Sequence, residues 1–219
     1  MKANLFGFVV FMLAGLGAAG QKPGSAANPF VLNPSVGTVA WGYYWSEAKP
    51  VLSVHSGDYV RVRTLITSNP ERLEAAGVPA DQVEKELRDV QAVKERGPGG
   101  HVLTGPIYVE EAEPGDVLEV HYDSIQLAIP YGYNAIGQAG FLSDEIFDRK
   151  TRIIQMDRSK MVGHFADGIE IPLHPFFGSA GWRRLRRWGN GTALRRGSMR
   201  GIWTIKTSWR VRRCSFRCL

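Results

Sequence analysis

The chain has 219 residues, a formal net charge of +6 and two cysteines. An even spread of its 27 Lys and Arg would suggest nucleic acid or acidic lipid as a partner. Twelve of them, however, lie in the last 38 residues, Trp182 to Leu219, which contain no Asp or Glu. The remainder holds 15 Lys and Arg against 21 Asp and Glu, so the net charge gives no reason to expect either partner.

The N-terminus has the pattern of a secretory signal peptide. Lys2 precedes an apolar run from Leu5 to Leu16, and small residues follow from Gly17 to Gly20. The run is too short to span a bilayer. We therefore expect residues 1–20 to be removed, leaving a secreted or periplasmic protein with no membrane contact; a buried N-terminal helix is the alternative.

Alternating apolar and polar residues predict strands in the first part of the body. The alternation covers residues 51–55 and returns at residues 59–63, and Ser56, Gly57 and Asp58 lie between the two runs. The same order recurs where Pro114, Gly115 and Asp116 precede the strand-like residues 117–122. Glycine and aspartate favour tight turns, so we predict two related antiparallel hairpins.

Helical signals occur between these two regions. Asn69 before Pro70 predicts a capped short helix, and the apolar spacing from Pro79 to Lys94 predicts a longer one. Residues 130–134 and 137–140 have the composition of an aromatic loop, which is either a lid or surface packing. Residues 21–181 are thus expected to form one α+β, predominantly β domain, with an antiparallel β-sandwich-like core and a short helical insertion.

Common nucleotide-binding, serine hydrolase and zinc protease motifs are absent from the sequence. Residues able to bind a metal or move protons fall into three clusters: His55 with Asp58; His101 with Glu110, Glu111, Glu113 and Asp116; and His164 with Asp167, Glu170 and His174. Structural interpretations exist for each cluster. Asp58 and Asp116 suit turns, His55 suits a strand surface, and His174 suits packing within a stiff apolar turn.

The second cluster is the most informative because His101 ends a Gly-rich loop and Glu110 follows an extended segment. A histidine and a carboxylate that meet at one sheet edge suit a divalent cation. Residues 101–120, HVLTGPIYVEEAEPGDVLEV, resemble the signature T-G-P-I/V-x-V-E-G-A-E-P-G-D of the acetamidase/formamidase family. Residues 171–181 resemble its later segment P-F-x-G-x-x-G, although Glu111 stands where the family usually has Gly.

The resemblance implies hydrolysis of short linear amides, such as formamide or acetamide, to ammonia and a carboxylate, in an enzyme that is a homo-oligomer when intact. A divalent metal, zinc or calcium, would polarise the amide. We expect His101 and Glu110 to be catalytic, and His101, His174 and Asp116 to be metal ligands. Tyr131, Tyr133 and Asn134 are candidate substrate contacts, with aromatic packing as the alternative. A secreted, non-catalytic β-rich binding module is the second functional hypothesis.

The tail after Gly181 has the composition of a shifted reading frame. If each overlapping codon starts on the third base, Gly181 to Gly189 permits V-A-P-P-P-P-M-G, and Ser198 to Lys206 permits H-A-G-N-M-D-N-K. The first continues the family pattern and the second matches its later H-x-G-N-M-D segment. We therefore predict that one base was lost, or two gained, near Gly181, and that residues 182–219 are non-native; a basic arm that binds nucleic acid or lipid is the alternative.

Overall fold

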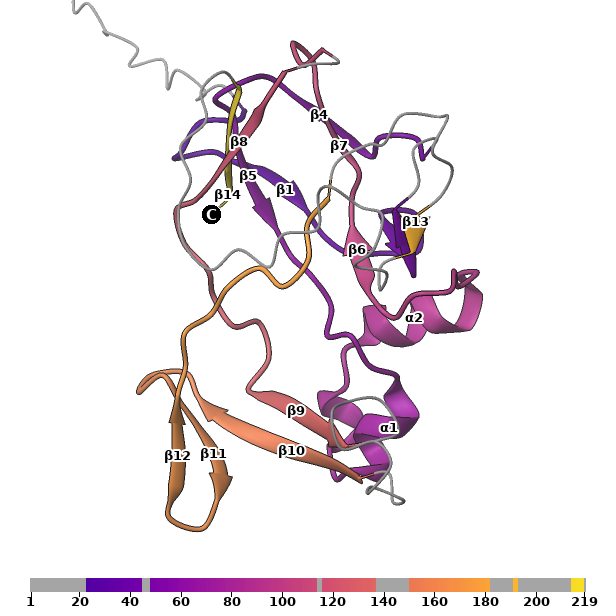
Figure 1. The fold of residues 1–219 in the computed structure, drawn as a ribbon, viewed down its shortest axis with the longest axis vertical. Coiled ribbons are helices and arrows are strands. Elements are labelled where there is room, and N and C mark those ends of the chain that lie inside the picture. Colours follow the sequence, from indigo (N-terminus) through magenta and orange to yellow (C-terminus); the bar gives the residue numbers. More distant parts are fainter. Residues whose placement is uncertain are drawn as a thin grey trace, which may run out of the picture.

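The computed structural model describes residues 23–44, 48–113, 116–136, 150–181, 191–192 and 214–218. Its strands are β1 (Phe30–Leu32), β2 (Val39–Trp41), β3 (Tyr43–Tyr44), β4 (Leu52–Val54), β5 (Tyr59–Val62), β6 (Val102–Thr104), β7 (Ile107–Val109), β8 (Leu118–Tyr122), β9 (Tyr131–Ile136), β10 (Lys150–Asp157), β11 (Val162–Ala166), β12 (Ile169–Pro172), β13 (Gly191–Thr192) and β14 (Cys214–Cys218). Its helices are α1 (Pro70–Ala75), the 3-10 helix η1 (Ala80–Gln82) and α2 (Lys85–Val93). The predominantly β, α+β class is confirmed (Figure 1).

The strands form several small sheets. One sheet has the order β1-β5-β14-β8, and its three pairings are parallel. The β4–β7 pair is also parallel, whereas β2 pairs with β6 antiparallel and β13 with β3 antiparallel. A four-stranded antiparallel sheet has the order β12-β11-β10-β9. The structure therefore contains parallel pairings in addition to antiparallel ones. Residue alternation alone does not distinguish the two.

The turn chemistry predicted for Asp58 and Asp116 is confirmed. The Asp58 carboxylate accepts the His55 backbone N–H at 2.7 Å, and Asp116 accepts the Glu113 N–H at 3.0 Å. Both predicted hairpins are wrong, however. Strands β4 and β5 on either side of Gly57 pair with β7 and β1, and strands β7 and β8 on either side of Asp116 pair with β4 and β14. A turn fixes the local chain reversal, but the strand partner is decided by packing of residues distant in sequence.

The short capped helix is confirmed. Asn69 is the N-cap of α1, and its side-chain oxygen accepts the Arg72 backbone N–H at 2.8 Å. The single helix predicted from Pro79 to Lys94 is wrong, because Val83 is extended between η1 and α2. Val93, the last apolar residue in the spacing from Pro79 to Lys94, is 67% exposed at the end of α2.

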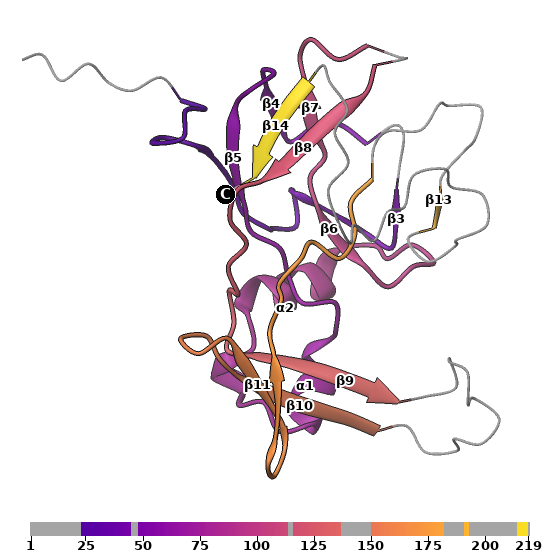
Figure 2. The same cartoon turned by 60° about the vertical axis from the view of Figure 1, so that its left-hand side comes forward.

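Two apolar clusters form the core. The first packs the helices, through Leu73, Leu87 and Val90, against residues of β2, β6 and β9. The second joins β1, β4, β5 and β7 through Leu32, Val54, Val60 and Val109. Figure 1 and Figure 2 show the helices between the upper strands and the β9–β12 sheet, so the insertion connects the two halves of the described structure.

Strand β9 corrects another prediction. Residues 131–134, predicted as a loop, lie in β9, which pairs with β10 from Tyr131–Gln155 to Ile136–Lys150. The pairing partner lies beyond residues 137–149, so local composition did not indicate it. Residues 137–140, assigned to the same loop, and the predicted signal peptide at residues 1–20 lie outside the described residues. Within the described part of the chain, no helix is long and apolar enough to cross a membrane.

The turn between β10 and β11 gives a pH-dependent prediction. The Asp157 carboxylate accepts the Ser159 hydroxyl at 2.6 Å and the Lys160 and Ser159 backbone N–H groups at 3.0 and 2.9 Å. These bonds lower the pKa of Asp157 to about 2, and the bond from the Ser159 hydroxyl has the largest effect. Because the unfolded pKa is about 4, this stabilisation is fully present above about pH 4 and is lost as the pH falls through about 2.

We therefore expect Asp157→Ala to lower the Tm at pH 6, and the difference from the parent chain to shrink between about pH 4 and pH 2. Thermal unfolding of both proteins across this range measures it. Asp167→Ala, in the turn between β11 and β12, is the matched control. A Tm difference that stays constant down to pH 2 would contradict the assignment.

Candidate functional site

The position of His101 is fixed by the Gly-rich loop before it. Its backbone carbonyl accepts the Gly42 N–H at 2.8 Å, and Gly97 and Gly99 bond to Trp41 and Gly42, each at 2.8 Å. Gly42 has φ +90°, and a Cβ atom there would lie 2.7 Å from the Gly97 carbonyl oxygen. Only glycine fits this close approach. The half-buried His101 thus stands at a defined place, where the loop meets β6.

Glu110 is the exposed residue that follows β7. Its backbone N–H donates to the Val54 carbonyl at 2.9 Å, which continues the β4–β7 pairing by one residue. Strand β6, which His101 precedes, pairs instead with β2. Among the described interactions none joins His101 to Glu110, so the expected meeting of imidazole and carboxylate at one sheet edge is not seen.

Glu111 makes the closest carboxylate–histidine pair of this region. Its carboxylate contacts His55 Nδ1 at 2.7 Å and accepts the Ser56 backbone N–H at 2.9 Å. Both contacts lower the pKa of Glu111 below its usual value, and the bond from the Ser56 backbone has a larger effect than the contact with His55. Both side chains are largely exposed, at 61% for His55 and 49% for Glu111. Glu111, which stands where the signature usually has Gly, thus links the turn after β7 to the turn after β4. It directly follows Glu110 in the chain.

The third predicted cluster is only partly assembled. His164 Nδ1 lies 3.3 Å from a Glu170 oxygen, because the two residues face each other across β11 and β12. His174 is exposed in the segment that follows β12. That segment then returns toward β8, where Phe177 stacks on Tyr122 with ring centroids 4.8 Å apart.

The predicted substrate contacts are divided between two faces of β9. Tyr131 is 1% exposed and packs in the first core cluster, with its hydroxyl 3.3 Å from the Gln82 carbonyl. Tyr133 packs against the same cluster and donates to the Thr67 carbonyl. Asn134 is exposed and, by strand alternation, points away from that core. The packing alternative therefore holds for both tyrosines, and the role of the exposed Asn134 as a substrate contact stays a prediction.

The predicted metal ligands His101, His174 and Asp116 are not gathered at one point. Among the residues that the structure describes, no three His, Cys, Asp or Glu side chains are placed to hold one metal ion. Asp116 already accepts a backbone N–H in its turn. The described part of the chain does not fit a metal by itself, and the metal role of these residues stays a prediction.

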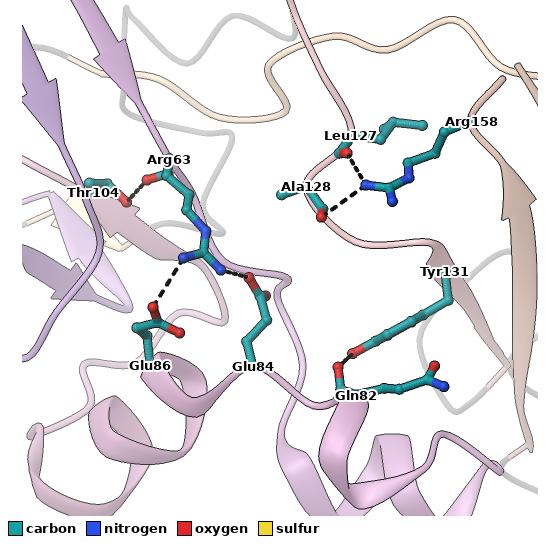
Figure 3. Close-up of polar contacts among 9 residues, drawn as sticks. All are labelled: Arg63, Gln82, Glu84, Glu86, Thr104, Leu127, Ala128, Tyr131 and Arg158. Atoms are coloured by element: carbon teal, nitrogen blue, oxygen red, sulfur yellow. Dashed lines mark hydrogen bonds and ion pairs between the residues drawn. The ribbon is translucent and has the colours of Figure 1, made fainter.

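Sequence patterns did not indicate the charge cluster around Arg63 (Figure 3). The Arg63 guanidinium donates to Glu84 at 2.9 Å and to Glu86 at 3.0 Å, and the Glu84 side chain is only 5% exposed. Partial burial opposes the charged form, but the hydrogen bond to Glu84 and the two negative charges together raise the pKa of Arg63. This cluster ties the end of β5 to the start of α2, so its role is structural.

Comparison with known proteins identifies the chain's relatives. The model of the acetamidase/formamidase family matches residues 44–184. An acetamidase from Bacillus halodurans has 18% identity and a TM-score of 0.51, and the match covers 74% of this chain and 48% of that one. A predicted acetamidase/formamidase from the thermophile Thermoanaerobacter tengcongensis has 21% identity and a TM-score of 0.47, over 70% and 46%. No curated protein gives a match.

The first of these structures supports the fold assignment, and this chain spans about half of its length. The family match includes both resembling segments, from the Gly-rich loop through His101 and Glu110 to residues 171–181. It covers more than half of the chain. The chain belongs to the acetamidase/formamidase family.

Proposed function

We propose that the intact protein of which this chain is a part hydrolyses short linear amides of the formamide or acetamide type. This proposal rests on the family match over residues 44–184, which contains the signature segment around Glu110. In the reaction, water adds to the amide carbon, the carbon–nitrogen bond breaks, and ammonia and a carboxylate are released. The substrate partner is therefore a small neutral amide.

Glu110 is the proposed general acid and base. It would take a proton from the attacking water and return it to the leaving nitrogen. Its exposed carboxylate can reach a bound molecule, and its backbone is fixed at Val54 on one side and by the Glu111 link on the other. His101 and Asn134 are the proposed groups that orient the amide.

A divalent ion, zinc or calcium, is a further proposal for the intact protein. When bound it would polarise the amide carbonyl. His101 and His174 supply imidazole donors, but the remaining ligands would have to come from the sequence that the shifted frame encodes after Gly181. Metal analysis of the frame-restored protein, before and after treatment with a chelator, tests this proposal.

The reading-frame change near Gly181 is proposed on two observations. The family match ends at residue 184, three positions after the predicted change. The alternative frame then permits the family's V-A-P and H-x-G-N-M-D segments at the expected places. Residues 182–219, including β13 and β14, are in this proposal a non-native tail, and residues 1–20 are a signal peptide that directs export.

Sequencing the DNA around the Gly181 codon and assaying ammonia release test the proposed function together. We expect the frame-restored protein to release ammonia from formamide or acetamide, and the present chain to be inactive. A restored protein that is folded but releases no ammonia from either amide would reject the amidase proposal and favour the non-catalytic binding module. Size measurement on the same sample tests the proposed homo-oligomer.

A further inference from the structure

The parallel β4–β7 pair ends on a side chain at the point where Glu110 leaves the sheet. The last pair in the register is Val54–Val109, and the Glu110 N–H still donates to the Val54 carbonyl at 2.9 Å. Continuation of a parallel ladder would next bond the Ser56 N–H to the Glu110 carbonyl. That N–H donates instead to the Glu111 carboxylate at 2.9 Å. The carboxylate thus takes the place of a backbone acceptor.

Both oxygens of the Glu111 carboxylate are engaged, and both turns that it joins are closed by bonds of their own. The second oxygen contacts His55 Nδ1 at 2.7 Å. The His55 backbone is held by Asp58, whose carboxylate accepts its N–H at 2.7 Å. On the other side, the Ala112 N–H donates to the Val109 carbonyl at 3.1 Å and turns the chain after β7. Glu111 therefore connects two defined turns.

The exposure of this link limits its effect to the local structure. The His55 and Glu111 side chains are 61% and 49% exposed. A charge pair in water contributes little to global stability. Its effect is instead to restrict one turn, which carries the exposed Glu110. The family signature usually has Gly in place of Glu111, and glycine offers no carboxylate for such a link.

We infer that Glu111 is a positioning residue, whose carboxylate replaces the last backbone acceptor of the β4–β7 pair and holds the turn that carries Glu110. The catalytic consequence rests on the proposed function of Glu110, whereas the link itself does not. The two adjacent glutamates then have different roles. Glu111 fixes the turn through both of its oxygens, and Glu110 presents its carboxylate to water and substrate.

Two variants test the inference. Glu111→Ala removes the carboxylate. It adds no backbone strain, because Met161 is the only non-glycine residue with positive φ in the part of the chain that the structure describes. Glu111→Gln is the conservative variant, since its amide oxygen can still accept the Ser56 N–H and its amide nitrogen can donate to a neutral His55. Because the link is exposed, both variants should keep a Tm near that of the parent.

Hydrogen exchange of single amides in the present chain measures the link without any activity. The Ser56 amide should exchange at least about tenfold faster in Glu111→Ala than in the parent, and at nearly the parental rate in Glu111→Gln. The His55 amide, which Asp58 holds, is the internal control and should not change. Equal Ser56 rates in the parent and Glu111→Ala would overturn the inference. Faster exchange of both amides would also overturn it, because that result indicates general loosening.

Ammonia release by the frame-restored protein measures the consequence for Glu110. Glu111→Ala should lower kcat/KM at least about tenfold, with kcat and KM both affected, and Glu111→Gln should restore most of this loss. Parental kcat and KM in Glu111→Ala would overturn the positioning role. If the frame-restored parent itself releases no ammonia, the amidase proposal fails, and the Ser56 exchange rates alone then decide whether Glu111 holds the turn.

Discussion

Glu110→Gln in the frame-restored protein is expected to lower kcat for formamide roughly 10²–10⁴-fold, the usual contribution of a general acid or base. The amide keeps the shape of the side chain but cannot take a proton from water. KM should change much less, because Glu110 is proposed to act on the proton and not to bind the substrate. Steady-state ammonia release from each variant measures both quantities.

Glu113→Gln is the matched control for this experiment. Glu113 is an exposed glutamate on the same turn, and its backbone N–H rather than its side chain makes the bond to Asp116. We expect its kcat to stay close to that of the parent. A Glu110→Gln enzyme that keeps parental kcat would remove Glu110 from the chemistry and leave the family assignment unchanged.

Glu111 separates a positioning effect from a catalytic one. Its carboxylate links the turn that carries Glu110 to His55 and Ser56. A substitution that removes the Glu111 carboxylate would shift Glu110 but leave the Glu110 carboxylate in place. Such a substitution should therefore change KM and kcat together. Glu110→Gln should instead affect kcat alone, and the difference identifies which residue handles the proton.

Local sequence rules predicted the features that depend on neighbouring residues. Asn69 caps α1, and Asp58 and Asp116 close their turns, because each of these side chains bonds a backbone N–H three residues away. The predominantly β class also followed from residue alternation. The signature around Glu110 led to the family because it is a continuous segment.

Contacts between distant residues were not predicted. The His55–Glu111 pair spans 56 positions, and the Arg63–Glu84 pair spans 21. The aromatic residues of β9 resembled a loop because their partner, β10, lies beyond residue 149. The helix from Pro79 was interrupted at Val83, next to the point where Glu84 turns its carboxylate to Arg63. In each case packing across the fold decided a feature that local propensity left open.

The same Arg63 cluster gives the largest expected loss of stability. Arg63→Ala should lower the free energy of unfolding by about 2–4 kcal/mol, because it leaves the Glu84 carboxylate buried without its partner. The value is set below the upper range for buried pairs, since the Arg63 side chain is 38% exposed and water can partly solvate the carboxylate. Urea unfolding of the present chain at pH 7 measures it.

Two further variants separate the lost charge partner from lost packing. Glu86→Gln removes only the more exposed contact and should cost less than about 1 kcal/mol. The double variant Arg63→Met, Glu84→Met removes both charges and should recover much of the loss from Arg63→Ala, because apolar side chains of similar size fill the site without an unpaired charge. If the double variant were as unstable as Arg63→Ala, packing of the arginine stem between β5 and α2 would be the cause instead.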